Sequence, residues 1–241
     1  MMIVRTYPRR GLHGAVVHEV GVRILRGDLA PGDLLPNEDE LSGELAVSRT
    51  VLREAIKVLA AKRLVESRPK TGTRVRERRD WNLIDPDVLA WQLEAGPSPQ
   101  FLENTVELRA IIEPAAARLA AERATDEQIA ALEQAHRELE AAGDDFAAFT
   151  EPDLRFHALV LEASGNELLE HMAGVIVSLL RTLFAFASRP PGAVRRAAPL
   201  HGSVVEAIRN RDPDAAEASV RALLDDSARN LNRALAGDAL E

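Results

Sequence analysis

The sequence contains no cysteine, which excludes disulfides, thiol nucleophiles and cysteine-ligated zinc sites. Aromatic residues make up only 4% of the chain, a scarcity that favours helices over a β-sandwich. The longest apolar stretch, residues 172–180, is too short to span a bilayer. The N-terminal basic residues are not followed by the continuous apolar core of a signal peptide. These absences predict a cytoplasmic, largely helical protein without a membrane segment.

The composition that remains is typical of a folded chain with two different parts. Hydrophobic residues at 46% and charged residues at 28% exclude a disordered protein. Residues 1–80 hold 16 basic and 11 acidic residues, a net charge of +5, whereas residues 81–241 hold 14 and 27, a net charge of −13. A basic module joined to an acidic one suits a protein whose first part meets a polyanion, although surface charge also scatters by chance.

The first eighty residues are predicted to form three helices and a β-hairpin. Apolar periodicity predicts helices over residues 12–25, 38–45 and 49–62. Ser48 is the expected N-cap of the third helix, and two alternating runs, 64–67 and 73–76, flank a Pro/Gly turn as the strands of a hairpin do. This order is that of a winged helix-turn-helix. The Arg-rich stretch 76–79 is the expected linker to a second domain.

The third predicted helix carries a basic stripe. Arg49, Arg53 and Lys57 stand at i, i+4 and i+8, where a recognition helix presents arginines to guanine in the major groove. The hairpin tip, residues 70–72, can approach the DNA backbone or minor groove closely because it contains glycine. A solvated helix face is the alternative explanation, but the stripe, the cap and the basic hairpin together favour a DNA-reading module.

From residue 81 onward the sequence predicts only helices. They are expected over residues 87–93, 101–123, 125–143, 154–163, 167–188, 194–210 and 213–235. Pro152 is expected in the first turn of the helix 154–163, with a kink in a longer helix as the alternative. The predicted organisation is a winged helix-turn-helix DNA-binding domain over 1–79 and an all-helical, bundle-like effector domain over 80–241.

Three stretches of the first domain carry a family resemblance. Residues 24–36 read ILRGDLAPGDLLP, residues 45–55 read LAVSRTVLREA, and residues 72–75 read GTRV. On these motifs residues 12–78 resemble the N-terminal domain of the GntR family of bacterial transcription regulators. The resemblance implies that the operator is contacted by Ser48, Arg49, Thr50, Arg53, Lys70, Thr71 and Gly72. The family usually has an arginine where this chain has Asp39, so one DNA contact is lost and an altered operator preference is expected.

The second domain carries a further set of motifs. They are ELR at 107–109, EPAA at 113–116, DLRFH at 153–157, ASGN at 163–166, and a histidine at 201. On these motifs residues 85–236 are similar to the all-helical FCD effector domain of the FadR-type branch of the family. Residues 81–91 are also similar to the galactonate repressors within that branch.

Asp153 and His157 are candidate metal ligands. They stand four residues apart, so both project from one helix face, as two ligands of a single metal must. Spacing alone does not single them out, because Glu167 and His171 share it. The resemblance selects Asp153 and His157, together with His201, as ligands of a divalent metal that sequence leaves open among zinc, nickel, manganese and iron.

Two more positions follow from the resemblance. Leu223 stands where the family has a fourth, histidine ligand, so weaker metal binding is expected. Arg109 matches the family arginine that helps to hold an organic-acid effector, and a guanidinium can clamp a carboxylate through two parallel hydrogen bonds. The alternative role for Arg109 is a salt bridge with Glu107 or Glu113 on its own helix.

Taken together, the sequence predicts a homodimeric repressor that a small carboxylic acid releases from double-stranded operator DNA. A sugar acid such as galactonate is favoured over lactate, pyruvate and similar acids. The enzymatic alternative is a metal-dependent hydrolase with a metal-bound water, but no general base beside the metal and no use for the basic hairpin emerge from the sequence. A nucleoid-type DNA-coating protein would have no need of the acidic second domain.

Overall fold

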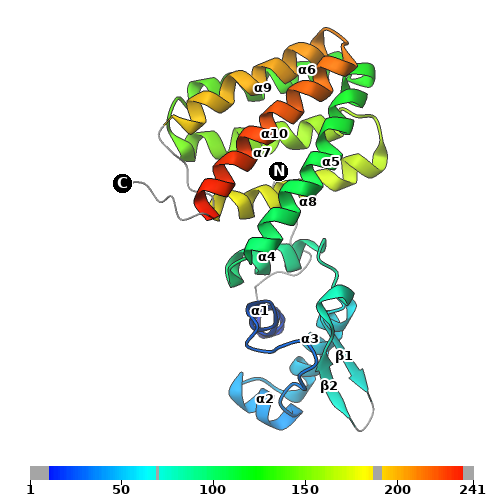
Figure 1. Ribbon diagram of the computed structural model, residues 1–241. Helices are drawn as coiled ribbons and strands as arrows, with labels where there is room; N and C mark the ends of the chain where they lie inside the picture. The colour runs from blue at the N-terminus through cyan, green and yellow to red at the C-terminus, as the bar shows by residue number, and fades with distance from the viewer. Residues whose placement is uncertain (1–10, 69–70, 187–191, 236–241) are drawn as a thin grey trace. The chain divides into compact units, whose positions relative to one another are not determined.

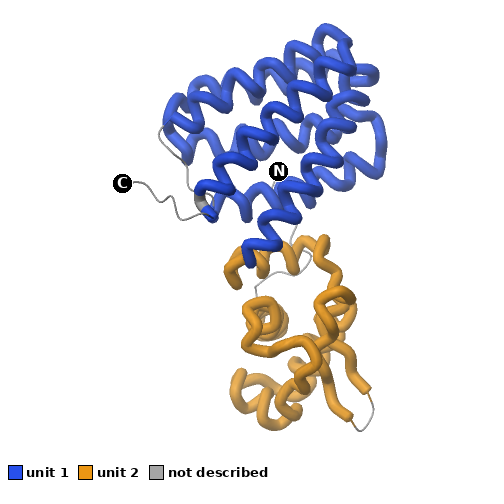
Figure 2. The backbone as a smooth tube through the Cα atoms, in the orientation of Figure 1, with its two compact units in different colours: residues 1–3, 98–241 blue, residues 4–97 orange. Residues whose placement is uncertain are grey.

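The computed structural model describes residues 11–68, 71–186 and 192–235. Within these residues the chain is mainly α-helical, as predicted, with ten α-helices and one two-stranded sheet. Two compact units divide between Pro97 and Ser98 (Figure 2). We call the part up to Pro97 the N-terminal unit and the part from Ser98 the C-terminal unit.

The N-terminal unit has the predicted order of three helices and a hairpin (Figure 1). Its elements are α1 (Leu12–Arg26), α2 (Glu38–Glu44), α3 (Arg49–Ala61), β1 (Val65–Arg68), β2 (Gly72–Val75), the 3₁₀ helix η1 (Arg78–Asp80) and α4 (Pro86–Ala95). Helix α3 packs against α1 and α2. The core includes fully buried Val20 of α1 and Leu52 and Leu59 of α3, all at positions that helical periodicity places on inner faces.

Side-chain caps fix where the helices of the helix-turn-helix begin. Asn37 accepts hydrogen bonds from backbone N–H groups in the first turn of α2, and the Glu40 carboxylate accepts from the Asn37 N–H, which completes a capping box. The Ser48 hydroxyl accepts from the Val51 N–H at 3.3 Å, which confirms Ser48 as the N-cap. Arg49 is therefore the first residue of α3.

The hairpin forms close to its predicted limits, and β1 pairs antiparallel with β2. Gly72 begins β2 with φ of 87°, a conformation that glycine adopts without steric strain from a Cβ atom. Leu34 forms an isolated bridge with Arg74 and adds one pair to the sheet. Of the predicted tip, Thr71 and Gly72 are exposed, and Lys70 lies outside the described residues.

The N-terminal unit continues past the stretch 76–79, which the sequence suggested as the linker. Trp81 is buried in the core of this unit, and its indole N–H donates to a backbone carbonyl at 2.8 Å. Helix α4 then packs on α1 so closely that a Cβ atom on Gly21 would lie 2.5 Å from the Trp91 ring. Because these two tryptophans hold the segment to the core, the compact units divide near residues 96–98 and not at the predicted 79/80 boundary.

The C-terminal unit is a bundle of helices (Figure 1). They are α5 (Pro99–Arg123), α6 (Asp126–Ala141), α7 (Phe146–Glu162), α8 (Glu167–Phe186), α9 (Ala193–Arg209) and α10 (Pro213–Leu235). Helix α10 packs against α5 and α9, and α7 packs against α6 and α8. The predicted capping box of Thr125 and Gln128 opens α6.

Helix α7 is longer than predicted. It begins at Phe146, where the Asp145 carboxylate caps the first turn, so Pro152 lies inside the helix and the expected first-turn position was wrong. Phe149 explains the extension, because it is buried two helical turns before Phe156 and continues the apolar face toward the N-terminus. The DLRFH motif therefore sits in the middle of a helix, where backbone geometry is well fixed.

The apolar stretch 172–180 is part of the 20-residue helix α8. The apolar segment is therefore longer than the stretch that the sequence analysis judged too short to span a bilayer. Among the described helices α8 alone is long and apolar enough to cross a membrane, by length and composition only. It packs against α7 and α5, with Ile176 and Leu180 fully buried. This packing is that of a core helix of the bundle.

Candidate functional site

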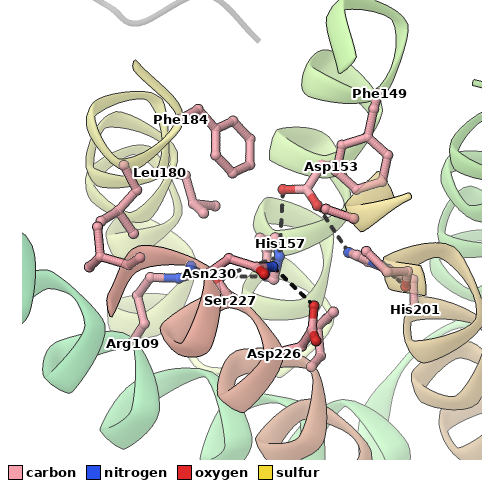
Figure 3. Close-up of a pocket in the computed structure, with 15 residues that line it drawn as sticks. Arg109, Phe149, Asp153, His157, Leu180, Phe184, His201, Asp226, Ser227 and Asn230 are labelled. Carbon is pink, nitrogen blue, oxygen red and sulfur yellow. Dashed lines mark hydrogen bonds and ion pairs between the residues drawn. The ribbon is translucent and has the colours of Figure 1, made fainter. Parts of the chain in front are cut away.

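The C-terminal unit contains a cavity lined by α5, α7, α8, α9 and α10 (Figure 3). All four residues that the sequence predicted for this domain line it. Helix α5 supplies Arg109, α7 supplies Asp153 and His157, and α9 supplies His201. The fold thus brings together side chains from three helices that are far apart in the sequence.

Asp153, His157 and His201 form a group that we call the metal triad. One nitrogen or oxygen atom from each lies within 4.8 Å of the others. His201 Nε2 is 3.1 Å from Asp153 Oδ1, and His157 Nε2 is 3.7 Å from Asp153 Oδ2. The three side chains are at most 6% exposed. A mixed oxygen and nitrogen donor set of this kind suits a divalent transition metal.

Hydrogen bonds on the far side of each imidazole assign its tautomer. Nδ1 of His201 donates to the carbonyl of Ala197 at 2.8 Å, and Nδ1 of His157 donates to Oε2 of Glu113 at 2.6 Å. In the neutral form that can bind a metal, each ring therefore carries a lone pair on Nε2. Among the described residues, neither Nε2 of His201 nor Oδ2 of Asp153 has a hydrogen-bond partner, although both atoms are buried. Buried acceptors without a donor are costly, and a cation would satisfy them, so the residues fit a metal.

Glu113 supports the metal triad from behind His157. Burial opposes ionisation of Glu113, but Arg109 and His157 outweigh burial and lower the pKa of this carboxyl to about 2. Burial likewise opposes ionisation of Asp153, yet the neighbouring His157 and His201 hold its pKa below the usual range. Both carboxylates are therefore charged at neutral pH. A carboxylate behind a ligating imidazole orients the ring and raises its basicity.

Arg109 forms the salt bridge that the sequence allowed as its alternative role. Its Nε lies 2.5 Å from Oε1 of Glu113, and its Nη2 lies 3.3 Å from Nε2 of His157. The pairing does not use the whole guanidinium, because Nη1 has no hydrogen-bond acceptor among the described residues. Arg109 also lines the cavity, so it keeps N–H donors for an anion beside the metal triad.

Helix α10 contributes residues to the cavity that the sequence analysis missed. Leu223 lines the cavity and is buried, so the position of the absent fourth ligand does face the metal triad's cavity. Asp226, Ser227 and Asn230 follow on the same face of α10 and also line it. Their spacing of i, i+3, i+4 and i+7 from Leu223 is the signal that could have found them.

The predicted DNA-contacting residues at the start of α3 are all exposed. They are the N-cap Ser48 and, within the helix, Arg49, Thr50 and Arg53. The opposite side of α3 buries Leu52 and Leu59. Arg49 pairs with Asp39, and Arg53 pairs through two hydrogen bonds with Glu38. Both acids come from the first turn of α2, so the stripe is held by ion pairs across the helix-turn-helix.

Comparison with known proteins matches both units to domains of bacterial regulatory proteins. Residues 12–75 match the bacterial regulatory proteins of the gntR family, and residues 104–226 match the FCD domain. The chain is 38% identical to the galactonate operon transcriptional repressor of Escherichia coli (strain K12), over 90% of this chain and 95% of that one. It is 35% identical to the HTH-type transcriptional regulator YieP of the same organism, over 90% and 94% of the two chains.

A solved structure supports the same assignment. A GntR protein of Streptococcus agalactiae superimposes with a TM-score of 0.52 at 26% identity, over 90% of this chain and 99% of that one. These relatives are transcription regulators and not enzymes, which sets the hydrolase alternative aside. The chain belongs to the GntR family of bacterial regulatory proteins and carries an FCD domain as its second part.

Proposed function

We propose that this regulator is a homodimeric, metal-dependent repressor that a sugar acid such as galactonate releases from its operator. The observation that carries the proposal is the cavity in which the metal triad leaves buried lone pairs unsatisfied beside the Arg109 guanidinium. The choice of a sugar acid is supported by the relative named as the galactonate operon transcriptional repressor.

The charges around the cavity favour an anionic effector once a divalent cation is bound. With neutral imidazoles, the carboxylates of Asp153 and Glu113 and the guanidinium of Arg109 sum to −1. The Asp226 carboxylate, which also lines the cavity, is paired with Arg229 and adds no net charge. A divalent cation changes this sum to +1. Three protein ligands leave coordination positions open to the carboxylate and hydroxyl oxygens of an acid. Zinc, nickel, manganese and iron all accept this donor set.

The N-terminal unit supplies the DNA contacts in this proposal. The exposed Arg49 and Arg53 have the spacing with which a recognition helix reaches base edges in the major groove. One small winged module makes too few contacts for useful specificity, so a dimer on a short inverted repeat is expected. Operator DNA of a bacterial regulator lies in the cytoplasm, and there we place the protein.

Effector and operator must be linked reciprocally. If the acid lowers operator affinity by a given factor, operator DNA lowers affinity for the acid by the same factor. This equality holds whatever movement connects the two units, so it can be tested without knowledge of that movement.

The experiment uses the full-length protein, zinc, and an operator selected by the wild type from random duplexes. Fluorescence anisotropy of the labelled operator follows its release by galactonate, lactate or pyruvate. Galactonate is expected to release the wild type from the operator. It should not release Arg109→Ala or the milder variant Arg109→Lys, although both variants should bind the operator normally without acid. Arg118→Ala is the matched control, because Arg118 lies on the same helix and pairs with Asp214 away from the cavity. If no acid releases the wild type from the operator, the proposal is contradicted. If lactate alone releases it, the effector is lactate and not a sugar acid.

A further inference from the structure

One wall of the cavity is polar where the packing of the bundle would favour an apolar face. The residues of α10 that line the cavity occupy one stripe of the helix and are Leu223, Asp226, Ser227, Asn230 and Leu231. The leucines at the two ends of the stripe are at most 5% exposed. The three polar residues between them face the same cavity as the metal triad (Figure 3).

Asp226 fixes the orientation of its neighbour Asn230. Oδ2 of Asp226 accepts a hydrogen bond from Nδ2 of Asn230 at 3.2 Å, and Oδ1 of Asp226 pairs with Arg229 at 3.2 Å. A charged carboxylate can only accept hydrogen bonds, so the amide nitrogen of Asn230 must be the atom that faces it. The amide oxygen of Asn230 is thereby held on the other side of the side chain.

The remaining polar atoms of this wall are free to bind a ligand. Among the described residues, neither the Ser227 hydroxyl nor Oδ1 of Asn230 has a hydrogen-bond partner. Ser227 can donate and accept, and Asn230 offers an acceptor and a second N–H. Adjacent donors and acceptors on a fixed helix face match a chain of hydroxyl groups, because each hydroxyl also donates and accepts.

We infer that Ser227 and Asn230 form a hydroxyl-reading wall that makes the cavity specific for polyhydroxy carboxylates. The inference rests on the proposed function, in which the metal triad and Arg109 hold the carboxylate end of the acid. Further hydroxyls of the ligand then bind to α10. An acid without these hydroxyls leaves the polar atoms of α10 facing an apolar group. A site built to hydrogen-bond a hydroxyl strongly rejects an analogue that lacks the hydroxyl.

The cavity volume is about 60 Å³, which is room for only a few water-sized groups. A ligand longer than a three-carbon acid must therefore extend beyond the cavity. Asp226 also lines an adjoining surface groove together with Arg195 and Arg229. Asp226 thus lines both spaces, whereas Ser227 and Asn230 line the cavity alone. A longer acid that extends past Asp226 would reach the groove.

The test is calorimetric titration of the zinc-loaded, full-length protein with galactonate and with lactate. Lactate is the matched probe, because it keeps the carboxylate and one adjacent hydroxyl but has no further hydroxyls. The variants are Ser227→Ala and Asn230→Ala, and the controls are Ser219→Ala and Asn232→Ala, which make the same changes on α10 at positions that do not line the cavity. We expect each cavity variant to bind galactonate about tenfold more weakly, with zinc content, operator affinity and lactate affinity unchanged.

Two outcomes overturn the inference and leave the proposed function intact. One is galactonate affinity that is equal in the wild type, Ser227→Ala and Asn230→Ala. The other is a wild type that binds lactate as tightly as galactonate. Absence of binding by the wild type to either acid instead contradicts the proposed function itself. Operator affinity without acid serves as the check that each variant is folded.

Discussion

Arg49 of the recognition helix and Asp39 of α2 form an ion pair, with Nη2 of Arg49 2.6 Å from Oδ1 of Asp39. Both side chains are more than 60% exposed, so the pair itself contributes little to stability. Its importance lies in its position. The Asp39 carboxylate pairs with the Arg49 guanidinium, which the proposed DNA complex needs. It also places a negative charge at the surface expected to meet the phosphates.

Asp39→Asn is predicted to tighten DNA binding. The amide removes one negative charge near the DNA and frees Arg49, so affinity for operator and random duplex alike should rise about threefold to tenfold at moderate salt. Anisotropy titrations at several salt concentrations measure this. Asp28→Asn is the matched control, because Asp28 is also exposed but pairs with Arg26 at the end of α1. Unchanged affinity of Asp39→Asn for both duplexes would place this carboxylate away from the DNA.

Arg49→Ala and Arg53→Ala are predicted to lower discrimination between operator and random DNA. If these arginines read bases, each substitution should cost about 1–3 kcal/mol on the operator and much less on random duplex. Lys57→Ala serves as the comparison, because Lys57 continues the stripe but pairs with Glu54 of its own helix. A purely phosphate-contacting lysine should weaken all sequences alike. Equal losses on operator and random DNA for both arginines would remove them from base reading.

The sequence predicts the local elements well because their signals are local. The Ser48 cap, the basic stripe and the four-residue spacing of Asp153 and His157 each depend on residues within a few turns of one helix. The position of His201 beside Asp153 came from family resemblance, since no periodicity links residues so far apart. A local pattern cannot reveal such a contact.

The polar wall of α10 and the buried cluster around Lys62 were not predicted, for a related reason. Ser227 and Asn230 look like ordinary surface residues until packing shows that their face of α10 borders a cavity. Lys62 likewise reads as part of the basic surface. In the fold it is buried, and its ammonium lies 2.8 Å from Asp85 and 2.6 Å from Asp87. Both features depend on which side of a helix the tertiary structure covers.

Lys62→Met is predicted to destabilise the N-terminal unit by about 3–5 kcal/mol. The methionine fills a similar volume but leaves the carboxylates of Asp85 and Asp87 without their buried cation, and an uncompensated buried charge is costly. Urea unfolding at neutral pH measures the loss. Lys57→Met makes the same change on an exposed residue of α3, paired only with Glu54, and should cost less than about 1 kcal/mol. A cost for Lys62→Met as small as that of this control would contradict the predicted role of the cluster.

The same cluster predicts a pH dependence. Burial lowers the pKa of Lys62, but hydrogen bonds to Asp85 and Asp87 outweigh burial and raise it above 10.5. A raised pKa means that the charged lysine contributes its full stability below pH 10.5 and loses it as pH rises through the higher value in the folded state. The stability difference between the wild type and Lys62→Met should therefore shrink as pH rises beyond 10.5. Parallel urea titrations at pH 8 and pH 11 give this difference, and a constant value would assign the stability to packing alone.

Leu223→His is predicted to strengthen metal binding. Leu223 lines the cavity that holds the metal triad, so an imidazole there can add a fourth ligand to Asp153, His157 and His201. Wild type, Leu223→His and His157→Ala are loaded with zinc, dialysed against the same mild chelator and assayed for metal content. Retention should be greatest for Leu223→His and least for His157→Ala. For all three proteins metal retention should fall at acid pH, because a histidine must be neutral to coordinate a metal.

Leu224→His provides the matched control for this last substitution. Leu224 is the next residue of α10 and is as buried as Leu223, but it does not line the cavity. The same change at Leu224 should not increase metal retention, although it also buries an imidazole. If wild type and His157→Ala retain equal metal, the metal triad is wrongly assigned. If Leu223→His retains no more than Leu224→His, the cavity-facing side of α10 does not offer a fourth ligand position.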